Sequence, residues 1–89
     1  MIGKELADPG FAAEYLTVSL ADSDPRVFLS ALRRVADVYG GVKRLSTKTK
    51  LNRENLYRML SERGNPGLRS LDAVLDALGF QLAVVKKAS

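Results

Sequence analysis

Hydrophobic residues recur at helical spacing in two segments of the first forty residues. They are Phe11, Ala12, Tyr15, Leu16 and Leu20 in the first segment, and Val27, Phe28, Leu32, Val35, Ala36 and Tyr39 in the second. Each segment begins with Asp-Pro, a pair that supplies an N-cap and a proline at the first helical position. The pattern predicts two helices within 9–39: one from about Pro9 to Ala21, and one that starts at Asp24-Pro25 and stops at Gly40-Gly41.

Three shorter helices are predicted downstream. The first covers 42–49, the second runs from its N-cap Asn52 to about Ser61, and the third runs from its cap Ser70 to Leu78, where Gly79 ends it. Their inward-facing positions are Val42, Leu45, Ser46, Leu56, Met59 or Leu60, Leu71, Val74, Leu75 and Leu78. Only a few residues separate the first two, so residues 42–61 have the layout of a helix-turn-helix, and the turn formers of 63–67 separate them from helix 70–78.

The end of the chain has a different pattern. Phe80 to Lys86 mixes alternation with β-branched residues, which predicts a short strand over 80–86. A lone strand cannot satisfy its own backbone groups, and no partner strand is obvious within the chain, so we expect it to pair with the same strand of a second copy. The expected fold is therefore all-α, with five helices and a short C-terminal strand used in dimerisation.

Length and composition limit the classes of function. With 89 residues the chain builds a single domain, 1–89, and its 46% hydrophobic and 27% charged residues are typical of a globular protein. The absence of cysteine and histidine excludes disulfides, zinc fingers and imidazole acid–base catalysis, so we expect no metal, no cofactor and no enzymatic activity. The first residues lack the apolar stretch of a signal peptide, and no window approaches the roughly 20 apolar residues of a membrane span, so we expect a cytoplasmic protein.

The positive charge is concentrated in one third of the chain. Residues 1–41 carry four basic and six acidic side chains, residues 42–69 carry eight basic and two acidic ones, and residues 70–89 carry two of each. The overall net charge of +4 thus hides a net charge of +6, eight minus two, in the segment that holds the predicted helix-turn-helix. This concentration is typical of a surface that binds a polyanion, although a solvated helix face has the same composition.

Two sets of residues resemble known families. The stretch from Leu45 to Leu60, followed by Gly64-Asn65-Pro66 and by Leu68 to Gly79, resembles the repressor-type (XRE/Cro-like) helix-turn-helix domains of phage and bacterial regulators. A wider set looks like the addiction-module antidote family, namely Tyr15-Leu16, Asp24-Pro25, Phe28-Leu29, Ala31-Leu32-Arg33, Gly40-Gly41, Asn55-Leu56-Tyr57-Arg58, Leu60-Ser61 and Gly64-Asn65-Pro66. The resemblance implies a repressor-like fold and an antitoxin that neutralises a small RelE-like ribonuclease toxin encoded beside it. It also implies a homodimer that binds double-stranded operator DNA and represses the shared promoter.

Two positions depart from the family pattern. The family usually has alanine where Ser46 stands and glycine where Lys50 stands. Since Lys50 lies in the predicted turn, it must either accept a left-handed backbone or alter the turn.

Four residues are candidates for contacts with base edges, namely Arg53, Glu54, Asn55 and Arg58. They occupy the first two turns of the predicted recognition helix, where the repressor-type domains that it resembles make such contacts. Arginine can donate two hydrogen bonds to guanine, and asparagine can pair with adenine. Glu54 has a structural alternative, because the helix dipole favours an acidic residue in a first turn.

Eight further residues are candidates for contacts with DNA phosphates, namely Lys43, Arg44, Lys48, Lys50, Asn52, Tyr57, Arg63 and Arg69. Such contacts position a protein on the duplex without specifying sequence. Two of the eight have structural alternatives. Asn52 has a role as a helix cap, and the ring of Tyr57 has the alternative of packing against the second helix, which is the interpretation we favour.

Three other functions stay open at this point. The first is a stand-alone transcriptional regulator without a toxin, which copurification of a partner would distinguish. The second is an interaction module in which the helix-turn-helix is only a scaffold, whose activity would survive the removal of basic side chains. The third is an enzyme, for which the chain shows no activated nucleophile.

Overall fold

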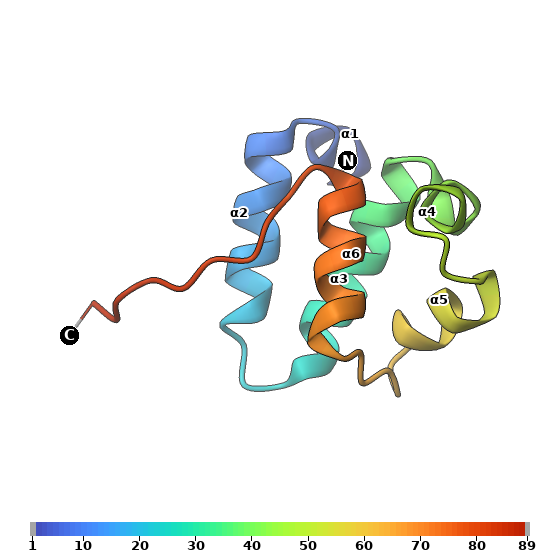
Figure 1. Ribbon diagram of the computed structural model, residues 1–89. Coiled ribbons are helices and arrows are strands. Elements are labelled where there is room, and N and C mark those ends of the chain that lie inside the picture. The colour runs from blue at the N-terminus through green and yellow to red at the C-terminus, as the bar shows by residue number, and fades with distance from the viewer. Residues whose placement is uncertain (1, 89) are drawn as a thin grey trace.

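The structure is a computed structural model and describes residues 2–88. These residues form six α-helices (Figure 1). They are α1 (Ile2–Leu6), α2 (Pro9–Leu20), α3 (Pro25–Val38), α4 (Gly41–Thr49), α5 (Arg53–Met59) and α6 (Leu68–Leu78). The all-α class is confirmed, with one helix more than the five expected. The additional helix, α1, spans five residues, which is too short for a hydrophobic period to show in the sequence. None of these six helices is long and apolar enough to cross a membrane.

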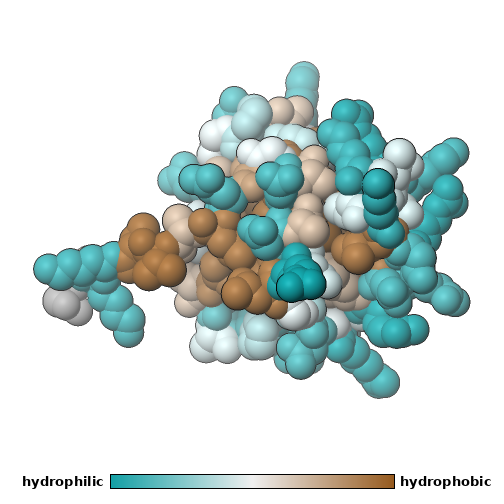
Figure 2. Space-filling model, viewed as in Figure 1, coloured by the Kyte–Doolittle hydropathy of each residue, from teal (hydrophilic) through white to brown (hydrophobic). Residues whose placement is uncertain are grey.

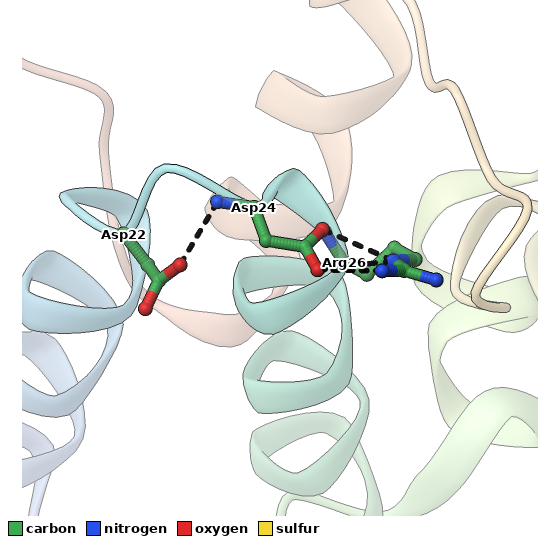
Figure 3. Close-up of polar contacts among 3 residues, drawn as sticks. All are labelled: Asp22, Asp24 and Arg26. Atoms are coloured by element: carbon green, nitrogen blue, oxygen red, sulfur yellow. Dashed lines mark hydrogen bonds and ion pairs between the residues drawn. The ribbon is translucent and has the colours of Figure 1, made fainter.

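The two Asp-Pro pairs start helices as predicted. The Asp8 carboxylate accepts a hydrogen bond from the Phe11 backbone N–H at 2.9 Å, and the Asp24 carboxylate accepts one from the Arg26 N–H at 2.9 Å. Asp24 also forms an ion pair with the Arg26 guanidinium at 2.8 Å, and its own N–H donates to Asp22 at 2.8 Å (Figure 3). These bonds satisfy backbone groups that a helix start leaves without partners, so the chain turns from α2 into α3 within four residues.

The hydrophobic core is built around α3, which packs against α1, α2 and α4. Its residues Leu32, Val35 and Ala36 are fully buried. The buried hydrophobic residues of the described chain form one cluster: Leu6, Ala12, Leu16, Phe28, Leu29, Ala31, Leu32, Val35, Ala36, Val42, Leu45, Leu56, Met59, Leu60, Val74, Leu75 and Leu78. All helices contribute to this cluster, so they fold as one unit.

Two residues of the predicted stripes lie outside the core. Val27 is 40% exposed and Leu20 is 56% exposed. Val27 directly precedes Phe28, and one residue corresponds to about 100° of rotation around a helix, so the two side chains point in different directions. Leu20 is the last residue of α2, beyond the two fully packed positions Ala12 and Leu16.

Some helix boundaries differ from the expected ones. α5 ends at Met59 instead of about Ser61, and α6 begins at Leu68 instead of after Ser70. Gly67 occupies the N-cap position of α6 with an extended backbone, and its carbonyl accepts the Leu71 N–H at 3.0 Å. The helix therefore starts without a side-chain cap, and Ser70 lies inside it.

The predicted strand 80–86 is not formed, because residues 80–88 have no regular secondary structure and no strand occurs within 2–88. The Phe80 N–H donates to the Leu75 carbonyl at 2.8 Å, and the Phe80 ring lies 6.0 Å from that of Tyr39. Phe80 and Leu82 pack against the core, and the chain then leaves the body beyond α2 (Figure 1). A strand needs a neighbour for its backbone groups, and the described part of this chain offers none. Pairing with a second copy stays a prediction.

Candidate nucleic-acid interface

The turn between α4 and α5 consists of residues 50–52 and has a left-handed residue at its start. Lys50 has φ 64° and ψ 12°, and its N–H donates to the Ser46 carbonyl at 2.9 Å. It is the one non-glycine residue with positive φ that the structure describes. Of the two alternatives for Lys50, the structure thus has the left-handed backbone, a conformation that costs an L-residue about 1–2 kcal/mol.

Two hydroxyl groups stabilise this turn from within α4. Ser46 Oγ donates to the Leu51 carbonyl at 2.8 Å, and the Leu51 N–H donates to Thr49 Oγ at 3.1 Å. Thr49 Oγ donates in turn to the Leu45 carbonyl at 2.7 Å. The sequence identified Ser46 as an inward-facing position and as a departure from the family pattern, but it indicated neither this bond nor the role of Thr49, because both depend on the position of the Leu51 backbone in the turn.

The N-terminus of α5 is capped as expected. Asn52 has an extended backbone, and its Oδ1 accepts the Asn55 N–H at 2.8 Å. This confirms the structural role of Asn52, and the contact with phosphate stays a prediction. The cap defines where the first turn of α5 begins, and with it the positions of Arg53 and Glu54.

α5 is anchored on one face and exposed on the other. Leu56 and Met59 are buried, and Leu60 is buried directly after the helix. With about 100° per residue, Glu54 and Arg58 lie opposite this anchor, Asn55 and Tyr57 lie at its two sides, and Arg53 lies closest to it. The five side chains are exposed, and α5 lies at an edge of the molecule beside α4 (Figure 1). The four predicted base-contacting residues therefore share one short helix, and all four side chains are exposed.

Tyr57 contacts α3 through a cation–π interaction. The guanidinium carbon of Arg33 lies 5.1 Å from the centre of the Tyr57 ring, and Arg33 Nε also donates to Asp37 at 3.3 Å. Tyr57 is still 50% exposed. The predicted packing of its ring against the second helix is observed in this form. Arg33 is a basic residue next to α5 that sequence reasoning missed. Its position outside the hydrophobic stripe predicts that Arg33 is exposed, but the residues near it in sequence do not indicate which helix it faces.

Arg63 is brought close to α5 by the loop that follows the helix. The Ser61 N–H and Oγ both donate to the Arg58 carbonyl, at 3.2 Å and 2.7 Å, and the Gly64 N–H donates to the Ser61 carbonyl at 2.9 Å. A Cβ on Gly64 would overlap the Met59 carbonyl, so the loop backbone lies directly against the end of α5. Asn55, Arg58 and Arg63 line one cleft of about 370 Å³ together with the start of α6.

Other predicted phosphate-contacting residues lie in other clefts. Arg44 and Lys48 line a cleft between α4 and α6 that also contains Asp76. Arg69 lines a depression between α6 and the C-terminal segment, next to Asp72. Lys43 and Lys50 are exposed on α4 and in the turn. Asn55, Arg58 and Arg63 therefore line one cleft, whereas Arg44, Lys48 and Arg69 line other clefts.

The arrangement offers hydrogen-bond donors and positive charge on an exposed helix. A helix of α5's width fits a groove about 12 Å wide, and its exposed arginine and asparagine side chains have the donors that base edges and phosphates accept. Glu54 is the one acidic side chain on α5, against two arginines. The exposed side of α5 thus has a net positive charge.

A family model described as "Probable addiction module antidote protein" matches residues 2–86, which is nearly the whole chain. Searches of curated proteins and of solved structures gave no match.

Proposed function

This chain belongs to the family of probable addiction module antidote proteins, and we propose that it both neutralises a RelE-like ribonuclease toxin and represses the promoter that it shares with that toxin. Membership gives the chain an antitoxin role and implies a toxin as its partner. An antitoxin of this kind acts by binding and not by catalysis. We propose further that it binds operator DNA in the cytoplasm as a homodimer, through a repressor-like helix-turn-helix formed by α4 and α5.

The observation that carries the DNA-binding proposal is the exposed face of α5. The helix follows α4 after a three-residue turn, buries Leu56 and Met59, and leaves Arg53, Asn55 and Arg58 exposed at an edge of the molecule. In helix-turn-helix proteins the second helix enters the major groove and its first turns contact base edges. We assign base contacts to Arg53, Glu54, Asn55 and Arg58, and phosphate contacts to Lys43, Arg44, Lys48, Lys50, Asn52, Tyr57, Arg63 and Arg69.

A homodimer would bind two half-sites about one helical turn apart, because a two-fold dimer presents two copies of α5 on one side of the duplex. The operator is then expected to be a palindrome. A monomer would contact one half-site only and would bind it weakly.

The DNA-binding proposal is tested by comparing operator and random DNA. Arg58→Ala is expected to lower affinity for the operator more than affinity for random DNA, whereas Lys48→Ala weakens binding to both alike. Lys4→Ala is the matched control, since it removes one exposed positive charge from α1. The measurement is fluorescence anisotropy with labelled duplexes at one fixed salt concentration. Equal effects of Arg58→Ala on both duplexes would contradict the assignment of base contacts.

The antitoxin proposal is tested separately by gentle affinity purification from the native host and intact-mass analysis. A stoichiometric basic partner of domain size is expected, and its ribonuclease activity should be suppressed in the complex. A preparation that binds operator DNA but brings no partner with it would favour the stand-alone regulator instead.

A further inference from the structure

The C-terminal segment carries an apolar surface that nothing in the described chain covers. After α6 the segment crosses the face of the molecule past α2 and ends away from the body (Figure 1). Phe80 and Leu82 are half-buried against the core, whereas Val84 is fully exposed and Val85 is 83% exposed. We refer to residues 83–88 as the arm. Burial of these two adjacent valines in a contact would be favourable in free energy, and the extended segment does not gain this free energy on its own.

α2 is also incompletely covered. Ala12 and Leu16 are buried on its inner face, but Val18 and Leu20 are 68% and 56% exposed. Val18 and Leu20 are two positions apart, or about 200° around the helix, so they lie on different sides of it. Leu20 lies next to the buried stripe and lines the groove described below, so this side of α2 has the composition of a contact surface.

An apolar groove joins α2 to the base of the arm. It has a volume of about 590 Å³ and is lined by Ala13, Leu16, Thr17 and Leu20 of α2, by Phe28 and Leu75, and by the chain's own C-terminal segment from Gly79 to Ala83 together with Val85. That volume corresponds to about twenty water molecules at roughly 30 Å³ each, enough for several side chains. Figure 2 shows hydrophobic residues gathered in this region, and a separate hydrophobic cluster on the arm, followed by hydrophilic residues at its tip.

The charges on the two surfaces are complementary. The arm ends in Lys86 and Lys87, neither of which forms an ion pair with another described residue. α2 contains Glu14 and no basic residue, and its flanking turns contain Asp8 and Asp22, whereas Asp24 is already paired with Arg26. An apolar arm with a basic tip thus fits an apolar helix face with acidic surroundings.

We propose that two copies of this chain associate by exchanging their arms, so that Val84 and Val85 of each copy take the place of the other copy's arm along Leu20 and the groove beside α2. Because arm and receiving surface belong to the same chain, the contact is made twice around a two-fold axis and closes as a dimer. This inference rests on the proposed function because it assumes the homodimer proposed there, and it names the surface through which the two copies associate. Pairing of the two arms with each other would leave Leu20 and the groove uncovered, so arm exchange accounts for more of the uncovered surface.

Sedimentation equilibrium of the full chain tests the exchange. Wild type is expected to dimerise. Each lost contact should raise the dimer dissociation constant about tenfold, and each contact occurs twice in the dimer, so Leu20→Ser should raise the constant about a hundredfold and Val84→Ser with Val85→Ser should raise it further. Val38→Ser is the matched control, because this half-exposed valine lies at the other end of α3 from the turn to α2 and is expected to change nothing. Circular dichroism melts confirm that each variant folds.

Three results would overturn the proposal. One is a monomeric wild type, which would leave the α2 surface for another occupant such as the basic toxin. Another is an unchanged dissociation constant for the double valine variant. The third is a loss of dimer in the arm variants but not in Leu20→Ser, which would indicate pairing between arms. Binding to a duplex with a single half-site distinguishes this inference from the proposed function. Monomeric variants should still bind that duplex weakly. A stable dimer that binds no DNA would refute the DNA-binding proposal and leave the arm exchange intact.

Discussion

At the scale of the residue, Lys50 combines two effects that a substitution can separate. Its left-handed backbone costs about 1–2 kcal/mol, whereas its charge is proposed to contact phosphate. Lys50→Gly is expected to raise the free energy of unfolding by up to about 1 kcal/mol, since the entropy of glycine in the unfolded chain offsets part of the gain. The same change should weaken DNA binding.

Lys50→Ala serves as the comparison, because it removes the charge and keeps the strain. It should weaken DNA binding as Lys50→Gly does, without the gain in stability. Urea denaturation gives the stability and anisotropy gives the affinity. A gain in stability for both variants would show that the backbone of Lys50 is not strained.

Asp24 is the second residue whose environment predicts a measurable effect. The side-chain hydrogen bond from Arg26, together with its backbone N–H and its charge, lowers the pKa of the Asp24 carboxyl below the ordinary value of 3.8, and the same pair raises the pKa of Arg26. Because the folded pKa is depressed, the stabilising contribution is present above the unfolded value and is lost as pH falls through the folded one. We expect an NMR titration to show Asp24 ionising below 3.8, and Arg26→Ala to return it toward that value. An identical titration curve in the variant would rule out the pair.

At the scale of the element, the loop after α5 positions Arg63 through one glycine. A side chain on Gly64 would overlap the Met59 carbonyl, so Gly64→Ala must move the loop. We expect a loss of about 1–3 kcal/mol of stability and weaker DNA binding as Arg63 is displaced. Gly67→Ala is the control, since nothing lies within 4 Å of the added carbon, and it should cost less than about 1 kcal/mol. Similar melting temperatures for the two variants would contradict the close approach of the loop to α5.

The elements also show why the helices could be predicted more readily than the C-terminal segment. Asp8, Asp24 and Asn52 cap helices through bonds to residues two or three positions away, so the sequence itself contains both partners. A strand has its partners in another segment or another chain. The β-branched pattern of 80–86 therefore indicated an extended conformation but could not supply the neighbour that a strand needs.

At the scale of the whole molecule, the uneven charge distribution predicts a strong dependence of DNA binding on salt. Residues 42–69 carry the net charge of +6, and they include α4, the turn and α5. If a dimer contacts six phosphates, affinity should fall about 10³-fold between 50 and 200 mM salt through the release of counterions. The logarithm of the binding constant is measured against that of the salt concentration. A flat line would contradict DNA binding through this surface, and Arg63→Ala should make the slope less steep.

By itself the sequence determined the all-α class, the positions of five helices, the two Asp-Pro helix starts, the cap at Asn52 and the concentration of positive charge, because each of these depends on neighbours in the chain. Only the tertiary structure decided that Arg33 lies over Tyr57, that Arg63 shares a cleft with Arg58, and that Arg44 and Lys48 line another one. It also left Val84 and Val85 without cover. These features depend on which segments, distant in sequence, lie close together in space. The packing of the common core decides this, and the local sequence does not.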